Sequence, residues 1–174
     1  MKIRIHTLST LLLLISFVGC SSVCNVCATK KKMSTQIGIY EKKSTNLVKI
    51  INNKDSAKEL VIARAKELIE ISKPILTGFQ EKYPQCHKYL QKVLDNSQKM
   101  QTLSLDNIEK NWHEGEALPQ DADTVCMETK ELIVHPSTVV ILANNDFQSK
   151  KNKEQMSDEI NEVIEHMSEL KESI

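Results

Sequence analysis

Glycine and proline are scarce in this chain, which has only four of each among its 174 residues. Both residues are typical of the turns that join short strands, so their scarcity argues against β-sandwiches and β-barrels. Lysine, glutamate and leucine are abundant instead, and these residues favour helices. With 26% charged and 40% hydrophobic residues, the composition is that of a folded domain that can bury a core.

An excess of basic charge is also missing. Lysine and arginine together number 23, as do aspartate and glutamate. Removal of an N-terminal leader that contains Lys2 and Arg4 would leave two more acidic than basic residues. Because phosphate binding needs a basic surface, we expect no nucleic-acid partner.

Catalytic signatures are missing as well. The sequence contains no nucleophile elbow, no glycine-rich phosphate loop and no H-E-x-x-H motif. The numerous carboxylates on the expected helix surfaces indicate solubility. We therefore expect a non-enzymatic binding or interaction module rather than an enzyme.

The N-terminus has the layout of a secretory signal peptide. Residues 1–19 carry two cations, Lys2 and Arg4, followed by the apolar run LLLLISFV and the small residue Gly19. The run is much shorter than the roughly 20 residues that span a bilayer. The sequence thus predicts export, with no permanent transmembrane helix in the leader.

The four residues FVGC, 17–20, resemble the lipobox of bacterial lipoprotein precursors. In that family the cysteine is acylated on sulfur and becomes the new N-terminus. The resemblance implies a lipid anchor at Cys20, with palmitate or a similar chain, although Phe17 stands where the family usually has leucine. It also implies attachment in the bacterial cell envelope facing the periplasm. By analogy with Gram-negative members of the family, Ser21 favours the outer membrane.

Two alternatives concern the same region. Cleavage after Ala28, where Val26 and Ala28 suit the small-residue rule, would release a secreted soluble protein. Cys24 and Cys27 form a C-x-x-C motif, and Ala28 in place of histidine excludes covalent c-type haem. A local pair is the main expectation, with metal binding and a thiol redox enzyme as alternatives.

Three segments are expected along the chain. They are a signal peptide over 1–19, a lipid-anchored flexible tether over 20–54 and a helical bundle domain over 55–174. The tether is inferred because residues 28–54 have scattered apolar residues, two lysine clusters and no sustained period, and a short helix near its end is left open. Lys30, Lys31 and Lys32 would lie near anionic headgroups if Cys20 is anchored.

Helical periodicity dominates from Asp55 onward. Ser56 and Glu59 suggest a capping box, and Pro74 is expected to end the first helix. Ser104 is the expected N-cap of a later helix. The predicted helices cover about 55–74, 84–97, 104–115, 122–133 and 153–171, and the run TVVILAN at 138–144 is assigned as a short buried helix. Since each has an apolar stripe, we predict an all-α bundle of four to five helices.

Cys86 and Cys126 fall on the inward stripes of two different predicted helices. The compartment beyond the inner membrane is oxidising, so the two residues are disulfide candidates. The alternative is a pair of buried free thiols.

His113 and His135 each lie where a predicted helix ends, the latter at a bend before Pro136. Together with Glu114 or Glu116 and the Cys126 thiol, they suggest a zinc or copper site. A haem or metal carrier is therefore the second functional class, with methionines as further haem ligands: Met100, Met156 and Met167. The competing interpretation is that the helix dipole favours histidine at a C-terminal turn.

His87 and His166 give no such signal and are expected to be solvated or edge residues rather than ligands. Residues 112–138, with W-H-E-G-E-A-L-P, a cysteine and H-P-S-T, bear a general likeness to small exported bacterial helical proteins of unknown function. That resemblance implies no activity.

Overall fold

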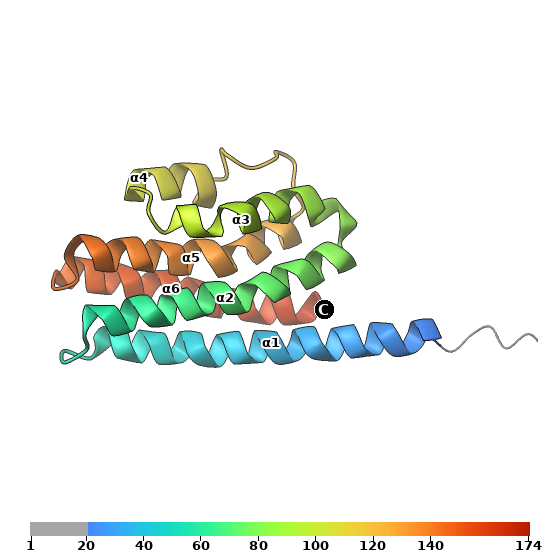
Figure 1. The fold of residues 1–174 in the computed structure, drawn as a ribbon, viewed down its shortest axis with the longest axis horizontal. Coiled ribbons are helices and arrows are strands. Elements are labelled where there is room, and N and C mark those ends of the chain that lie inside the picture. The colour runs from blue at the N-terminus through green and yellow to red at the C-terminus, as the bar shows by residue number, and fades with distance from the viewer. Residues whose placement is uncertain (1–20) are drawn as a thin grey trace, which may run out of the picture.

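A computed structural model describes the backbone of residues 21–174 and the side chains of residues 30–174. The predicted signal peptide and the acylation site Cys20 lie outside this part of the chain. So do the side chains of Cys24, Cys27 and Ala28. Within the described residues the regular elements are helices, with no strand (Figure 1). None of these helices combines the length and the hydropathy needed to cross a bilayer.

The helices follow one another with short connections, apart from the loop that precedes α5. In chain order they are α1 (Ser21–Asn52), α2 (Lys58–Lys82), the 3₁₀ turn η1 (Pro84–Cys86), α3 (His87–Met100), α4 (Leu105–Ile108), the π-helical turn η2 (Glu109–His113), α5 (Thr124–Asp146) and α6 (Lys150–Glu172).

Four long helices form the body of the bundle. The helix α5 packs on α2 and α6, and α1 packs on the same two helices from the other side. In Figure 1, α1 lies along one edge, and α3 and α4 lie at the opposite edge, against α5. The prediction of an all-α bundle is confirmed, with five helices of 14 residues or more and the four-residue α4.

The expected tether is replaced by α1 over most of its length. One side of this helix is buried at spacings of three and four residues, at Met33, Ile37, Tyr40, Ser44, Leu47 and Ile51. This is a seven-residue repeat, the spacing that holds one face of a helix against its neighbours. The polar Ser44 within the stripe and the lysines around it conceal the pattern. The bundle therefore includes Met33–Ile51, and its predicted start at residue 55 is corrected.

Two prolines were expected to interrupt helices, and neither does. Pro74 lies inside α2 and Pro136 inside α5. Each costs one backbone hydrogen bond, but the helices continue because the residues beyond are buried. The 11 residues from Ile133 to Ala143 are all buried in α5. The separate helix expected at 138–144 is thus the second half of α5, and His135 lies within the helix rather than at a bend.

The helix starts give a mixed result. The expected capping box is wrong, because α2 begins at Lys58 with Ala57 as N-cap and no side-chain cap. Ser104 is confirmed as a cap, since its hydroxyl accepts a hydrogen bond from the Asn107 amide at 3.3 Å. Gly115, with φ of 80°, occupies the left-handed region after η2, where glycine is favoured.

The cysteine pair expected to form a disulfide does so in the structure. The Sγ atoms of Cys86 and Cys126 are 2.01 Å apart, and both residues are buried. The bond ties η1 to the first turn of α5.

Candidate metal site

Three side chains from three elements converge between η2, α5 and α6. His113 ends η2, His135 lies in the middle of α5, and Glu159 lies in α6. One donor atom from each lies within 4.8 Å of the other two. The two histidines predicted from the sequence are therefore brought together, and the structure adds a carboxylate that the sequence did not indicate.

The π-helical turn positions His113. A π turn holds an extra residue, which changes the direction of the side chains that follow it, and such turns recur at functional sites. Here Trp112 is buried in the core and the next residue, His113, keeps only 14% of its side chain exposed. The turn thus directs consecutive large side chains into the protein.

Glu159 lies against both imidazoles. Its Oε2 is 2.8 Å from His135 Nδ1 and 3.5 Å from His113 Nε2. The Thr138 hydroxyl lies 3.3 Å from the same His113 nitrogen. The side chains of Glu159 and His135 are 12% and 4% exposed, so this contact is largely removed from water.

Glu131 approaches the same imidazoles at their other nitrogens. Its Oε2 lies 3.4 Å from His113 Nδ1 and 3.6 Å from His135 Nε2. This oxygen is buried and has no hydrogen-bond partner among the described residues. Each ring therefore presents one nitrogen to Glu159 and the opposite nitrogen to Glu131.

Lys130 holds the Glu131 carboxylate in place beside the two imidazoles. Its ammonium donates to the His113 backbone carbonyl at 2.9 Å and to Glu131 Oε1. The side chain of Lys130 is 3% exposed, and a lysine this buried requires an anionic partner. The lysine thereby neutralises Glu131 and ties η2 to α5.

The electrostatic consequences follow from burial and pairing. Desolvation acts to raise the pKa of Glu159, but hydrogen bonds from His113 and His135 and their positive charge outweigh it and lower the pKa to about 2. For His113, desolvation acts to lower the pKa. The hydrogen bond with Glu159 and the charges of Glu131, Glu159 and Glu109 outweigh it, so the pKa is raised.

Two imidazole nitrogens and one carboxylate oxygen form a familiar ligand set for a divalent transition metal. Tetrahedral ligands with bonds of 2.0–2.2 Å lie about 3.3–3.6 Å from one another. His113 Nε2 and Glu159 Oε2, at 3.5 Å, already have this separation. The 2.8 Å contact between His135 and Glu159 is instead a hydrogen bond, and its proton lies between atoms that a metal would bridge.

Several ligands expected from the sequence are absent from this cluster. Cys126 is engaged in the disulfide. Glu114 and Glu116 are exposed, and Glu116 faces Lys110 at 3.5 Å. The three methionines, Met100, Met156 and Met167, are buried in the hydrophobic core. The imidazole rings of His113 and His135 contact each other edge to face, with their centroids 4.6 Å apart. This separation leaves no room for a porphyrin between them.

A local signal for the missing carboxylates does exist. Glu131 precedes His135 by four residues, one helical turn, so the two share a face of α5. Glu159 lies on the face of α6 that meets this face of α5. The E-x-x-x-H spacing of Glu131 and His135 is thus the local signal for the Glu131 carboxylate.

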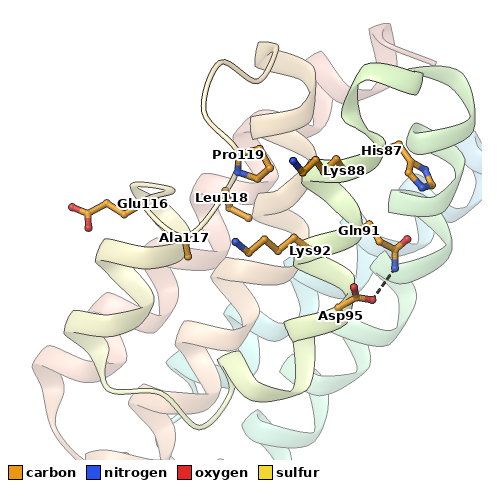
Figure 2. A pocket seen from close by; sticks show the side chains of 9 residues that line it. All are labelled: His87, Lys88, Gln91, Lys92, Asp95, Glu116, Ala117, Leu118 and Pro119. Carbon is orange, nitrogen blue, oxygen red and sulfur yellow. Dashed lines mark hydrogen bonds between the residues drawn. The ribbon is translucent and has the colours of Figure 1, made fainter.

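A surface hollow of 630 Å³, lined by none of the cluster residues, lies between α3 and the loop after η2 (Figure 2). Its lining includes Lys88 and Lys92 but also Asp95, which accepts a hydrogen bond from Gln91 at 2.8 Å. His87, expected to be solvated, is exposed at its rim. The charges are mixed and do not converge on a point, so the histidine cluster is the better candidate site.

Comparison of the chain with known protein families, curated proteins and solved structures finds no match.

Proposed function

We propose that this protein is a non-enzymatic binding module that holds a divalent transition-metal ion at His113, His135 and Glu159. It is exported and held at the periplasmic face of the envelope by a lipid on Cys20. The observation that carries the metal assignment is the convergence of three donor atoms within 4.8 Å.

The position of Glu131 suits metal binding, although its Oε2 forms no hydrogen bond with either imidazole in the metal-free protein. Ligating histidines usually donate their second ring N–H to a carboxylate, which fixes the tautomer and raises the basicity of the ligand nitrogen. Glu131 lies near the second nitrogen of both His113 and His135. Protonation of those two nitrogens leaves the lone pairs of His113 Nε2 and His135 Nδ1 directed toward Glu159.

The ligand set favours a transition-metal ion such as Zn²⁺ over Mg²⁺ and Ca²⁺. Imidazole suits Zn²⁺, Cu²⁺ and Ni²⁺, whereas Mg²⁺ and Ca²⁺ prefer oxygen ligands. Two histidines and one glutamate leave a fourth tetrahedral position for water. The burial of all three ligands favours retention of an ion over turnover of a large substrate.

The competing interpretation is a buried ion-pair network without metal. His113 and His135 would then be structural, and their charges would offset those of Glu131 and Glu159. The two interpretations differ in what occupies the space between the ligands, a proton or a metal ion, and metal binding must release that proton.

Isothermal titration with ZnCl₂ tests the proposal on the mature chain. Cys24→Ala and Cys27→Ala are included so that the C-x-x-C motif cannot bind the ion. We expect one tight binding step and a rise in melting temperature with added zinc. His113→Ala and His135→Ala should each weaken that step by at least about 100-fold, by analogy with the cost of disturbing supporting residues alone.

His87→Ala is the matched control, because His87 is exposed on α3 and should not alter binding. Substitution with Co²⁺ provides a second readout, since visible absorption bands report the ligand geometry. An unchanged melting temperature in zinc, copper and nickel would establish the ion-pair network and remove the proposal.

The location is tested separately by the intact mass of the membrane-extracted protein. A mass that begins at Cys20 with added acyl chains supports the lipid anchor. A mass that begins at residue 29, or one that retains Met1, contradicts it.

A further inference from the structure

The helices α5 and α6 carry the same spacing of acidic residues and histidine, E-x-x-E-x-x-x-H. In α5 it comprises Glu128, Glu131 and His135, and in α6 it comprises Glu159, Glu162 and His166. Residues three and seven positions apart lie on one face of a helix. Each helix therefore presents two carboxylates and one imidazole along a single face.

The two faces meet in opposite directions. At one end, His135 of α5 contacts Glu159 of α6 at 2.8 Å. At the other end, His166 of α6 contacts Glu128 of α5, also at 2.8 Å. Each histidine thus meets the first glutamate of the pattern on the other helix. The histidine–glutamate pair of the candidate metal site is therefore repeated two turns away, without a second histidine.

We infer that Glu128, His166 and Glu169 form a second divalent-metal site on this seam, nearer the surface. One donor atom from each residue lies within 4.8 Å of the other two. The side chains of Glu128 and His166 are 22% and 39% exposed. Glu169 follows His166 by three residues, so the two lie on adjacent turns of α6.

A buried carboxylate oxygen of Glu128 lies at this second cluster and contacts His166. Glu128 Oε2 is inaccessible to solvent and has no hydrogen-bond partner among the described residues. It is 2.8 Å from His166 Nδ1, an ion-pair distance without hydrogen-bond geometry. The ion pair with His166 holds this oxygen only while the imidazole is protonated, and a metal ion in place of that proton would supply the same interaction.

The two sites are separate. Seven helical residues span about 10.5 Å, so an ion at Glu128 and His166 lies far outside the 3.5–4 Å of a two-metal centre. The outer site has a single imidazole and is partly exposed. We therefore expect it to bind Zn²⁺ more weakly than the inner site and to depend on different residues.

The test is titration of the mature chain with ZnCl₂, again with Cys24→Ala and Cys27→Ala. Two steps are expected, and His166→Ala should remove the weaker one while the tight one persists. Glu128→Gln should weaken the same step by at least about 10-fold. Glu165→Gln changes an exposed carboxylate beside His166 and should change neither step.

His135→Ala distinguishes this inference from the proposed function. It should remove the tight step and leave the weaker one. If His166→Ala and Glu128→Gln leave two steps intact, the second site is contradicted, whatever the inner site does. Copper loading gives an independent readout, because two Cu²⁺ ions about 10 Å apart show dipolar coupling in electron paramagnetic resonance. Absence of that coupling in doubly loaded protein would also overturn the inference.

Discussion

The hydroxyl of Tyr40 donates a hydrogen bond to the backbone carbonyl of Leu132 at 2.9 Å, across 92 residues of sequence. In a regular helix this carbonyl would accept from the amide four residues later, but that residue is Pro136, which has no N–H. A side chain of α1 therefore satisfies the acceptor that the proline leaves free in α5. Burial raises the pKa of Tyr40 far above its usual value, so the phenol remains a donor.

Tyr40→Phe should destabilise the protein by about 1–3 kcal/mol, because it leaves a buried carbonyl without a partner. Urea unfolding followed by circular dichroism measures the change. Tyr89→Phe is the matched control, since no hydrogen bond from the Tyr89 hydroxyl is present among the described residues. Equal stability of the two variants would contradict this role for Tyr40.

Reduction of the disulfide between Cys86 and Cys126 should lower stability by about 4 kcal/mol, since it releases a loop of 40 residues in the unfolded chain. Unfolding with and without reductant measures the loss. The variant Cys24→Ala/Cys27→Ala should show the same loss, which assigns it to the bundle. Alkylation should label Cys86 and Cys126 only after reduction, and labelling of both in untreated protein would rule the bond out.

Lys130 and Glu131 should be strongly coupled. Lys130→Met leaves a carboxylate buried without its cation and should cost about 3–5 kcal/mol. The double variant Lys130→Met/Glu131→Gln should be more stable than the sum of the single changes predicts, by at least about 1 kcal/mol.

The exposed pair Lys150 and Glu154, 3.3 Å apart, provides the control cycle. Its coupling should be about 0.5 kcal/mol or less. Similar coupling energies in the two cycles would show that burial does not strengthen the interaction between Lys130 and Glu131.

In the metal-free protein, the stability contributed by the shifted pKa values of His113 and Glu159 should be greatest between about pH 4.5 and 6.5. The raised pKa of His113 gives stability that is complete below its unfolded value of 6.5 and is lost as pH rises through the higher folded value. The lowered pKa of Glu159 gives stability that is complete above 4.5 and is lost as pH falls toward 2.

The acidic groups that face His113 are Glu109 on η2, Glu131 on α5 and Glu159 on α6. His135 and Lys130, both on α5, also lie against it. His113→Gln should therefore flatten the alkaline side of the stability profile, whereas His87→Gln should leave it unchanged. Unfolding in urea across pH 4 to 9, in the presence of a chelator, provides the profile. An alkaline slope that persists in His113→Gln would assign it to another group.

Several local features could be read from the sequence because they depend on neighbouring residues. The amphipathic stripes of α3 and α6 and the cap at Ser104 are examples. The inward positions of Cys86 and Cys126 also follow from helical phase, but their pairing depends on the tertiary structure, which brings the two Cα atoms to 5.3 Å. Features that depend on a residue far away in the sequence could not be predicted in this way. The sequence predicts a bend before Pro136, because no residue near Pro136 indicates that Tyr40 supplies the hydrogen bond that the proline cannot donate.

The sequence by itself determined that this chain is helical, and it singled out His113 and His135 as the candidate metal ligands. Only the tertiary structure decided that α1 belongs to the bundle, that α5 runs through its proline, and that Glu159 faces both imidazoles. The physical reason is that helix formation and capping are local, whereas a donor set is assembled from η2, α5 and α6. Those elements become neighbours only when their apolar faces pack together.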